Sequence, residues 1–343
     1  MKGYRVVFPV ANSVEIEEFD VREPSEGEVL IESVATLIST GTELTALTGD
    51  FPKPSAWSMY VKYPFIPGYS CVGRIIMCGA NVKGFKTGDL VAATSPHATH
   101  TTIRADQIMS VPEGINVEEA CFHTIAAGVM NSIRLAKVSL GESVAVVGLG
   151  LLGQMAVMFA RMAGAYPVIA IDLAEYRLKL SKLSGATHTL RADDWSYVRE
   201  SVRNITRGRM VDKVFEVTGN PSVIPEAITL TKPLGCFVVL SSPRGKTAID
   251  FHDEVNRPSR MIIGTHFSSQ PEQETPYNPW TRKRNTELFF DLLSAGYIKV
   301  SHLITHRYFW RDAGEAYKML LRDRSNAMGV ILQFKTAGTE GTD

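Results

Sequence analysis

The segment 144–160 constrains the fold of this chain more than any other. A short apolar run, Val144–Val147, is followed by three glycines in the spacing Gly-x-Gly-x-x-Gly and then by a helical, mostly apolar run. This pattern predicts a strand, a tight turn and a helix whose N-terminal N–H groups face the pyrophosphate of a dinucleotide. Gly148 permits the turn, Gly150 lets the ligand approach the backbone, and Gly153 lets the helix lie close to the strand. The expected pyrophosphate-binding residues are Gly148, Leu149, Gly150, Leu151, Leu152 and Gly153.

A second predicted strand, 168–171, ends in Asp172, about twenty residues beyond the last glycine of the motif. An acidic side chain at this distance typically accepts hydrogen bonds from the adenosine ribose. Its carboxylate would repel the 2′-phosphate of NADP, and the next two residues are not basic, so we expect NAD as the cofactor. Arg177 is placed to present a cation near the adenine, and we expect Thr218 to belong to the cofactor site as well. The alternative for Asp172 and Arg177 is helix capping without a ligand.

Composition limits the classes of protein to which the chain can belong. It has 343 residues, 45% of them hydrophobic, and its 36 basic and 36 acidic residues balance. This size allows two domains with a core each, and the only basic cluster, 282–284, is too short to predict nucleic-acid binding. The first residues lack an apolar signal core, and no run approaches the roughly eighteen apolar residues of a membrane span, so we expect a cytoplasmic protein without membrane contact. Four cysteines in apolar surroundings predict free thiols rather than disulfides.

The pattern of apolar residues changes along the chain. Residues 1 to about 120 predict a β-rich domain with a barrel-like core, and residues 117 to about 264 predict strands alternating with helices in a doubly wound parallel sheet. The tail 336–343 is small and polar and is expected to be disordered. The strands expected are 4–10, 14–21, 28–35, 70–77, 89–93, 101–110, 211–217, 236–240 and 329–334. The helices expected after the glycine motif are 174–184, 196–204, 224–231, 286–295 and 312–321.

Five short motifs follow one another in an order typical of one enzyme family. They are STGTE at 39–43, PGYSCVG at 67–73, KTGDLV at 86–91, the glycine motif, and LITHR at 303–307. In this respect nearly the whole chain resembles the medium-chain dehydrogenase/reductase family, which is alcohol dehydrogenase-like. The resemblance implies an α/β fold with two domains. Residues 1–124 and 269–343 would form a GroES-like β-barrel catalytic domain, and residues 125–268 a Rossmann NAD-binding domain.

The positions that bind zinc in this family carry other residues here. Zinc members have a cysteine at the position of Thr40 and Gly-His-Glu where this chain has Gly68, Tyr69 and Ser70. Hydroxyl groups are poor zinc ligands beside thiolate and imidazole. The four closely spaced cysteines of the family's structural zinc lobe are also missing, since 94–100 contains none. We therefore expect no metal. A different metal site is the alternative, and its ligands would come from Cys71, His97, His100 and His123.

The motifs also indicate a branch of the family and a class of substrate. STGTE, PGYS and PHATH resemble the zinc-lacking branch that includes the bacteriochlorophyllide hydroxyethyl dehydrogenases. This resemblance implies NAD-linked interconversion of a secondary alcohol and a ketone, and we expect a polar substrate such as a sugar, a cyclitol or a secondary metabolite. The insertion 268–285 is either a surface or dimer loop or a lid in which Trp280 and Arg284 contact a polar or anionic substrate. The residues that match pocket-wall positions of the family are Thr94, Ser95 and His97.

Loss of zinc changes what the catalytic residues must do. A positioned base that titrates near neutral pH must take the alcohol proton, and histidine fits this requirement best. His123 matches the third zinc ligand of the family and is the first candidate, although its apolar neighbours fit a core histidine equally well. Tyr69 is the second, as a phenol that polarises the oxygen. Thr42 matches a proton-relaying hydroxyl of the zinc enzymes, and Thr40 lies beside it.

The sequence is compatible with two other functions, and it also predicts the state of association. A zinc-free enone or quinone reductase would prefer NADPH, which Asp172 disfavours, and a non-catalytic nucleotide-binding protein would not need convergent polar groups. A strand at 261–264 is expected at an edge of the nucleotide sheet, where exposed apolar residues need to be covered. The family pairs such edges between subunits. We therefore expect a homodimer or homotetramer that acts on a small molecule.

Overall fold

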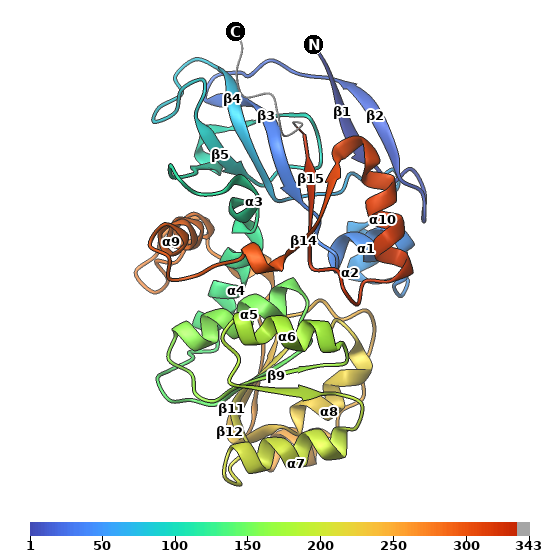
Figure 1. Ribbon diagram of the computed structural model, residues 1–343, viewed down its shortest axis with the longest axis vertical. Coiled ribbons are helices and arrows are strands. Elements are labelled where there is room, and N and C mark those ends of the chain that lie inside the picture. Colours follow the sequence, from blue (N-terminus) through green and yellow to red (C-terminus); the bar gives the residue numbers. More distant parts are fainter. Residues whose placement is uncertain (335–343) are drawn as a thin grey trace. The chain divides into compact units, whose positions relative to one another are not determined.

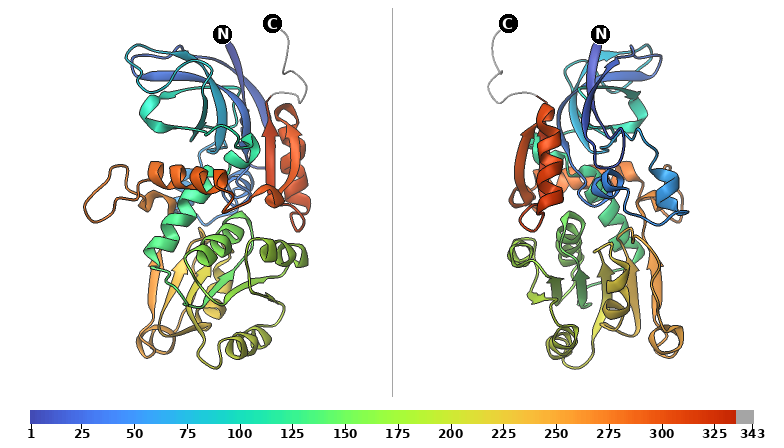
Figure 2. Two further views of the ribbon diagram at one scale, coloured as in Figure 1. Left: turned by 60° about the vertical axis from the view of Figure 1, so that its left-hand side comes forward. Right: turned by 90° about the vertical axis from the view of Figure 1, so that its right-hand side faces the viewer.

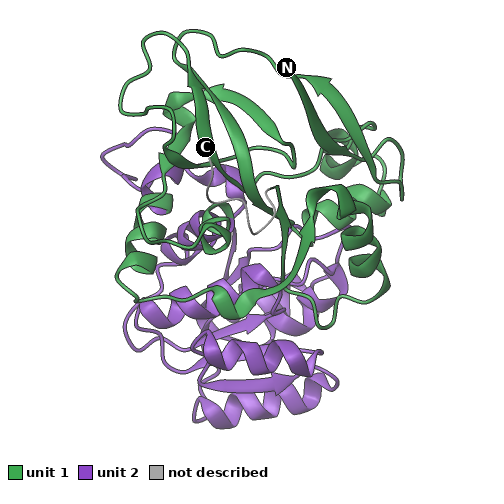
Figure 3. Cartoon of the chain, turned by 45° about the horizontal axis from the view of Figure 1, so that its top comes forward, with its two compact units in different colours: residues 1–124, 286–343 green, residues 125–285 purple. Residues whose placement is uncertain are grey.

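The computed structural model describes residues 1–334, which form two compact units (Figure 3). Unit 1 contains residues 1–124 and the C-terminal segment that starts at Thr286, and unit 2 contains residues 125–285. The second boundary expected from the sequence, after residue 268, lies too early. Residues 269–285 still belong to unit 2, because hydrogen bonds tie them to helix α4 (His123–Leu135). Asn131 Nδ2 donates to Ser269 Oγ at 2.9 Å, and Arg134 Nε donates to Asn285 Oδ1 at 3.3 Å.

Unit 2 is built on a parallel sheet with the doubly wound order (Figure 1). The chain runs outward from a central strand in one direction, returns to the centre and continues in the other direction, so the two central strands form a topological switch point. The glycine turn follows one of these two strands. Across the sheet the strands are β10 (His188–Arg191), β9 (Val168–Asp172), β8 (Val144–Val147), β11 (Val211–Glu216), β12 (Thr231–Val239) and β13 (Met261–Gly264).

Helices cover both faces of this sheet. Helix α5 (Leu151–Met162) follows the glycine turn, and α6 (Glu175–Leu183) follows β9. On the other face, α7 (Trp195–Ile205) and α8 (Ile224–Ile228) pack their apolar side chains on β8, β9 and β11. The expected helix 224–231 is too long, because the chain turns at 229–230 and is already in β12 at Thr231. The short strand β10, which has a single buried residue, was not expected.

Unit 1 combines a two-stranded antiparallel hairpin with a larger sheet (Figure 1). The order of the larger sheet is β14-β15-β3-β4-β5-β7, with β6 also paired to β3. The single strand expected at 101–110 is two strands, because a turn of 3₁₀ helix at Ala105–Gln107 sends β6 to β3 and β7 to β5. The strands are β1 (Lys2–Val7), β2 (Glu15–Asp20), β3 (Glu28–Leu37), β4 (Cys71–Cys78), β5 (Leu90–Ala93), β6 (His100–Arg104), β7 (Ile108–Ser110), β14 (Ile304–Phe309) and β15 (Gly329–Gln333).

Short helices complete unit 1 and close its core. Helix α10 (Ala313–Arg322) packs with α1 (Thr42–Thr48) in one apolar cluster, although the two lie far apart in the sequence. Helix α9 (Arg282–Ser294) starts earlier than the expected 286 and crosses the boundary between the units. The remaining helices are α2 (Ala56–Tyr60) and α3 (Val117–Ala120). No helix in residues 1–334 is long and apolar enough to cross a membrane. The expected disordered tail, 336–343, lies outside the described residues.

Candidate active site

Glycine serves a different structural purpose at each of the three positions of the motif. Gly148 has a φ of +94°, which side-chain-bearing residues rarely adopt, and a Cβ there would lie 2.8 Å from the backbone nitrogen of Thr218. A Cβ on Gly153 would lie 1.9 Å from the carbonyl oxygen of Gly148, so α5 can approach the turn only with glycine at this position. At Gly150, in contrast, no atom of a described residue other than its chain neighbours lies within 4 Å of the place a Cβ would take. The free space beside Gly150 fits a ligand that contacts the backbone directly, as the pyrophosphate of a dinucleotide does.

The first turn of α5 is open to such a ligand. The helix starts at Leu151 with Gly150 as its N-cap, and no side chain accepts a hydrogen bond there. Its first N–H groups therefore lack the capping partner that Ser, Thr, Asp or Asn would supply, and an anion can take that place. Leu149 and Leu151 are buried, whereas Leu152 is partly exposed, so in this stretch the leucines anchor the turn.

Asp172 ties the end of β9 to the glycine turn. Its Oδ2 accepts a hydrogen bond from the N–H of Leu149 at 2.7 Å, and its Oδ1 accepts one from the N–H of Ala174 at 2.8 Å. Arg177 Nη1 lies 3.9 Å from the same carboxylate. The carboxylate thus borders the glycine turn and accepts from the N–H just before α6, but no side chain caps the first turn of that helix.

A buried carboxylate next to this turn was not singled out from the sequence. Glu216, the last residue of β11, is fully buried, and its Oε1 accepts hydrogen bonds from the N–H of Thr218 at 2.7 Å and from the Thr218 hydroxyl. The Ser241 hydroxyl donates to Oε2. Glu216 therefore fixes Thr218 where it packs on Gly148. The available signal was an acidic residue directly after the apolar pair Val214-Phe215, at the carboxyl end of a strand.

In unit 1, the structure brings Tyr69 and Thr42 together. The Tyr69 hydroxyl donates to the hydroxyl of Ser39, and the side chain of Thr42, the first residue of α1, lies near enough to the phenol to lower its pKa slightly. Thr40 lies in the turn that precedes this helix. Burial of the phenol raises the pKa of Tyr69 to about 12, so the hydroxyl keeps its proton at neutral pH. Ser39 is a site residue that sequence reasoning missed, although it begins the STGTE motif.

His123 is the first residue of α4 and is almost fully buried. The hydroxyl of Thr124 lies 3.3 Å from its Nδ1 and donates a hydrogen bond to the backbone carbonyl of Tyr69 at 3.0 Å. The ring of Phe290 lies beside the imidazole, with a centroid distance of 6.4 Å. Thr124 therefore links the two candidate catalytic residues, His123 and Tyr69, within unit 1.

The expected position of His97 at a pocket wall disagrees with the structure. Its side chain is fully buried in unit 1, with Nδ1 at 2.7 Å from the Thr36 hydroxyl and Nε2 at 3.0 Å from Glu43 Oε2. Both ring nitrogens are occupied by the core, so they are not available to a substrate. Ser95 is also buried and bonds to the hydroxyl of Thr101, whereas Thr94 is exposed.

The side chains at the family's zinc positions do not form a zinc site. Ser70 donates its hydroxyl to the carbonyl of Cys121 at 2.6 Å, and Cys71 contacts the Ser33 hydroxyl at 3.4 Å. Burial raises the pKa of Cys71 to about 11, which opposes formation of the thiolate that zinc requires. In residues 1–334, no three His, Cys, Asp or Glu side chains gather in a group that could hold a metal ion. The donor set therefore does not fit zinc.

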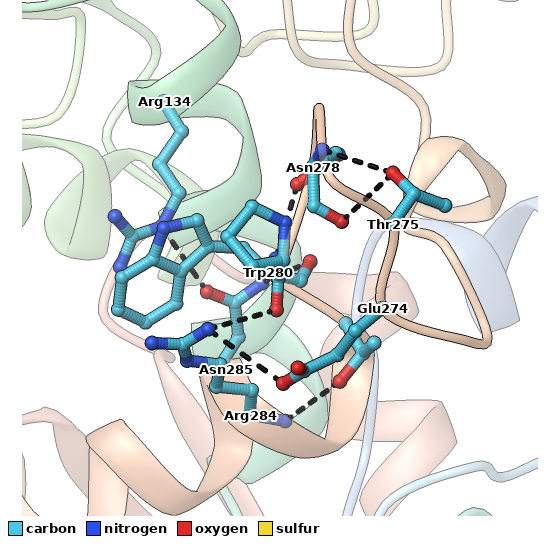
Figure 4. Close-up of polar contacts among 9 residues, drawn as sticks. Arg134, Glu274, Thr275, Asn278, Trp280, Arg284 and Asn285 are labelled. Atoms are coloured by element: carbon cyan, nitrogen blue, oxygen red, sulfur yellow. Dashed lines mark hydrogen bonds and ion pairs between the residues drawn. The ribbon is translucent and has the colours of Figure 1, made fainter.

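The insertion after β13 contains the last two expected site residues. Trp280 lies in the loop that leads from β13 into α9, drawn in orange in Figure 2, and Arg284 lies beside it in the first turn of α9 (Figure 4). Trp280 is partly buried, and the loop before it is exposed. The structure thus joins these two residues to each other and to α4.

Comparison with known proteins agrees with this two-part architecture. Residues 25–140 match the family model described as an alcohol dehydrogenase GroES-like domain, and residues 152–281 match the model described as a zinc-binding dehydrogenase. Together the two matches span more than half of the chain. Unit 1 is accordingly the GroES-like part and unit 2 the Rossmann-like part of the fold.

Curated relatives and solved structures are similar over nearly the whole chain. The L-threonine 3-dehydrogenase of Pyrococcus abyssi is 26% identical, covering 94% of this chain and 96% of the relative. The sorbitol dehydrogenase of Bacillus subtilis is 26% identical (93% and 94% covered), and the D-guloside 3-dehydrogenase of Escherichia coli is 27% identical (80% and 83%). A crystal structure of an E. coli alcohol dehydrogenase with the cofactor NADH has a TM-score of 0.82 at 19% identity, covering 97% of this chain and 99% of that one.

Proposed function

The chain belongs to the medium-chain alcohol dehydrogenase family of the zinc-binding type, and we propose that it is itself a zinc-independent, NAD-dependent dehydrogenase. Its substrate would be a secondary alcohol of a polar metabolite. The observation that carries the proposal is the glycine turn, with free space at Gly150 and the Asp172 carboxylate bonded to the N–H of Leu149. These residues would hold the pyrophosphate and the adenosine ribose of NAD.

The absence of a fitting zinc site determines how the chemistry would be divided among side chains. Bound NAD supplies a hydride acceptor for the alcohol carbon. The alcohol proton must then go to a protein group, because no metal-bound alkoxide forms. His123 is the candidate base. Tyr69 keeps its proton, so it would turn its hydroxyl from Ser39 to the substrate oxygen and donate a hydrogen bond there rather than take a proton.

The substrate class follows from the relatives and from the hydroxyl groups near Tyr69. The names of two relatives, sorbitol dehydrogenase and D-guloside 3-dehydrogenase, refer to sugar-type substrates, which supports a polyol or sugar derivative. Ser39 and Thr42 surround the Tyr69 hydroxyl with groups that both donate and accept hydrogen bonds. Such groups suit a substrate rich in hydroxyls. A screen of polyols, cyclitols and sugar derivatives with NAD, followed by NADH absorbance, tests this proposal.

Cofactor titration distinguishes the proposed NAD-dependent dehydrogenase from the alternative, a reductase that uses NADPH. A zinc-free enone or quinone reductase would bind NADPH more tightly than NADH, whereas Asp172 favours NADH. Asp172→Asn keeps the size of the side chain and removes its charge, so it should weaken NADH and narrow the preference between the two cofactors. Tighter binding of NADPH than NADH by the unaltered protein would refute the NAD assignment. Lack of turnover on every alcohol, with NADH binding intact, would favour a non-catalytic nucleotide-binding protein.

The exposed edge of unit 2 supports the proposed association. Within residues 1–334, strand β13 pairs only with β12 and lies at the edge of the sheet, as expected. Met261 and Ile262 are 52% and 37% exposed on this strand, which leaves apolar side chains and free backbone groups for a second copy. We propose a homodimer in the cytoplasm with the β13 edges paired, which can assemble further into a tetramer.

A further inference from the structure

Two arginine side chains stack on one tryptophan ring in unit 2. The guanidinium carbon of Arg134, on α4, lies 3.3 Å from the ring centroid of Trp280, and that of Arg284, on α9, lies 4.3 Å from it (Figure 4). Guanidinium groups stack on indole rings through cation–π attraction and dispersion. The indole thus holds two positive charges close together, although they repel each other.

The surrounding residues leave this positive charge largely uncompensated. Arg284 Nη1 lies 3.6 Å from Glu274, but both side chains are substantially exposed, so this ion pair is weak. In the described part of the chain, no acidic side chain acts on the charge of Arg134, whose pKa is shifted only by burial and by Arg284. Burial and the neighbouring Arg284 lower the pKa of Arg134 to about 10, which leaves it cationic at neutral pH but poorly stabilised. The neighbouring residues Arg282 and Lys283 are also basic, so they do not compensate this charge.

The two guanidinium groups are nevertheless held in place. Arg284 Nη1 donates to the carbonyl of Pro279 at 3.2 Å, and Arg134 Nε donates to Asn285 Oδ1 at 3.3 Å. Asn285 is fully buried, and its Nδ2 donates to Gln270 Oε1 at 3.3 Å. Both Nη atoms of Arg134 have no hydrogen-bond acceptor among residues 1–334. The cluster therefore presents preorganised donors that the protein does not use.

We propose that Arg134, Arg284 and Trp280 form a binding site for a phosphoryl group. Two guanidinium groups match the charge of a phosphate dianion, and their planar N–H pairs match its oxygens. Trp280 sets the positions of both groups. The phosphoryl group is either free phosphate or part of the substrate. In the second case the proposal rests on the dehydrogenase function and narrows the substrate to a phosphorylated polyol or sugar.

The first test is direct binding of inorganic phosphate to the full-length protein with NADH present, by isothermal titration calorimetry at constant ionic strength. Arg284→Gln and Arg134→Gln should each weaken phosphate binding by about tenfold or more, because a charge-assisted bond to the anion is lost. Lys283→Gln is the matched control, since it removes the same charge from an exposed neighbour that does not stack on Trp280. It should change the affinity by less than about twofold.

A second readout follows Trp280 itself. Phosphate should change the tryptophan fluorescence of the unaltered protein, and this change should disappear in Trp280→Phe, which keeps an aromatic face. Arg284→Lys keeps the charge without the planar fork and should bind phosphate at intermediate strength, with an unchanged melting temperature. Phosphate binding that is absent in the unaltered protein, or lost equally in Lys283→Gln and Arg284→Gln, would overturn the proposal.

Kinetics then distinguish the two sources of the phosphoryl group. If the substrate carries it, Arg284→Gln should raise KM for a polyol phosphate about tenfold and leave KM for the unphosphorylated polyol unchanged. Free phosphate should then compete with the substrate. If the site binds free phosphate instead, calorimetry should show phosphate binding. Arg284→Gln should then change KM by the same factor for the polyol phosphate and for the unphosphorylated polyol. Failure of the dehydrogenase function would appear as no turnover with either polyol, and the calorimetric result would stand independently.

Discussion

The Nε2 atom of His97 lies 3.0 Å from Oε2 of Glu43, in the interior of unit 1. The hydroxyl of Tyr317 donates to the same carboxylate oxygen, and the N–H of Ser39 donates to the other one at 2.8 Å. Glu43 therefore accepts three hydrogen bonds from three different segments. Since the hydroxyl of Ser39 also accepts from Tyr69, this buried carboxylate positions the residues around the candidate phenol.

Removal of this carboxylate should destabilise unit 1. Glu43→Ala leaves His97, Tyr317 and the Ser39 N–H without their acceptor, and we expect a loss of about 3–5 kcal/mol. The melting temperature should fall by roughly 10 °C, as followed by circular dichroism. Tyr317→Phe removes one donor and should cost about 1–2 kcal/mol. Glu315→Ala, at an exposed site, is the control and should stay within about 0.5 kcal/mol. A melting temperature of Glu43→Ala equal to this control would show that the buried network contributes nothing.

His123→Ala should impair chemistry more than cofactor binding. If the imidazole takes the alcohol proton, kcat should fall by about 10² to 10⁴-fold while the affinity for NAD stays close to that of the unaltered enzyme. The rise of the rate with pH should flatten, because general base catalysis needs the neutral imidazole. Steady-state kinetics between pH 5 and 9 measure both effects. A variant that keeps its rate and its pH profile would return His123 to a purely structural role.

Tyr69→Phe should lower kcat without changing the shape of the pH profile. Burial raises the pKa of Tyr69 from its ordinary value of 10.0 to about 12, so the phenol stays protonated between pH 5 and 9. It can therefore donate a hydrogen bond but not act as a base in this range. We expect kcat to fall by about tenfold to a hundredfold through loss of this donor. Loss of the acidic limb of the profile in Tyr69→Phe would mean that tyrosine, not histidine, takes the proton.

Metal analysis should find well under one zinc per chain. Thr40 and Tyr69 replace two family ligands by hydroxyl groups, and the hydroxyl of Tyr69 is bonded to Ser39. Dialysis against a chelator should leave both the activity and the melting temperature unchanged. Stoichiometric zinc that is lost together with activity would contradict the zinc-independent mechanism. Elemental analysis of protein purified without chelator provides the measurement.

The edge of unit 2 should control association. Ile262→Lys puts a charge on the exposed edge strand β13 and should shift the protein toward the monomer, as measured by light scattering at micromolar concentration. Lys232→Ala, on the neighbouring strand β12, removes a charge elsewhere on the sheet and should leave association unchanged. A protein that is already monomeric without substitution would refute the proposed dimer.

The sequence indicated the parts of the site that depend on local geometry. The turn at Gly148, the close approach at Gly153 and the space at Gly150 involve residues a few positions apart, so their spacing predicts the conformation. The same holds for the edge strand β13, whose position follows from the alternation of strands and helices. Breaks within extended segments, such as the turn between β6 and β7, depend on which distant strand each piece pairs with, and the local pattern does not contain that information.

Only the tertiary structure decided what the buried polar side chains do. His97 lies 54 positions from Glu43, and Tyr317 lies 274 positions from it, so no local pattern could join them. Histidine on an irregular loop fits a pocket wall, a metal site and a core hydrogen bond equally well in sequence. The core position prevailed because a buried carboxylate needs donors to replace water. The loop between β5 and β6 supplies His97, and the packing of α10 on α1 brings Tyr317 to the same carboxylate. Arg134 and Trp280 are likewise joined only by the fold.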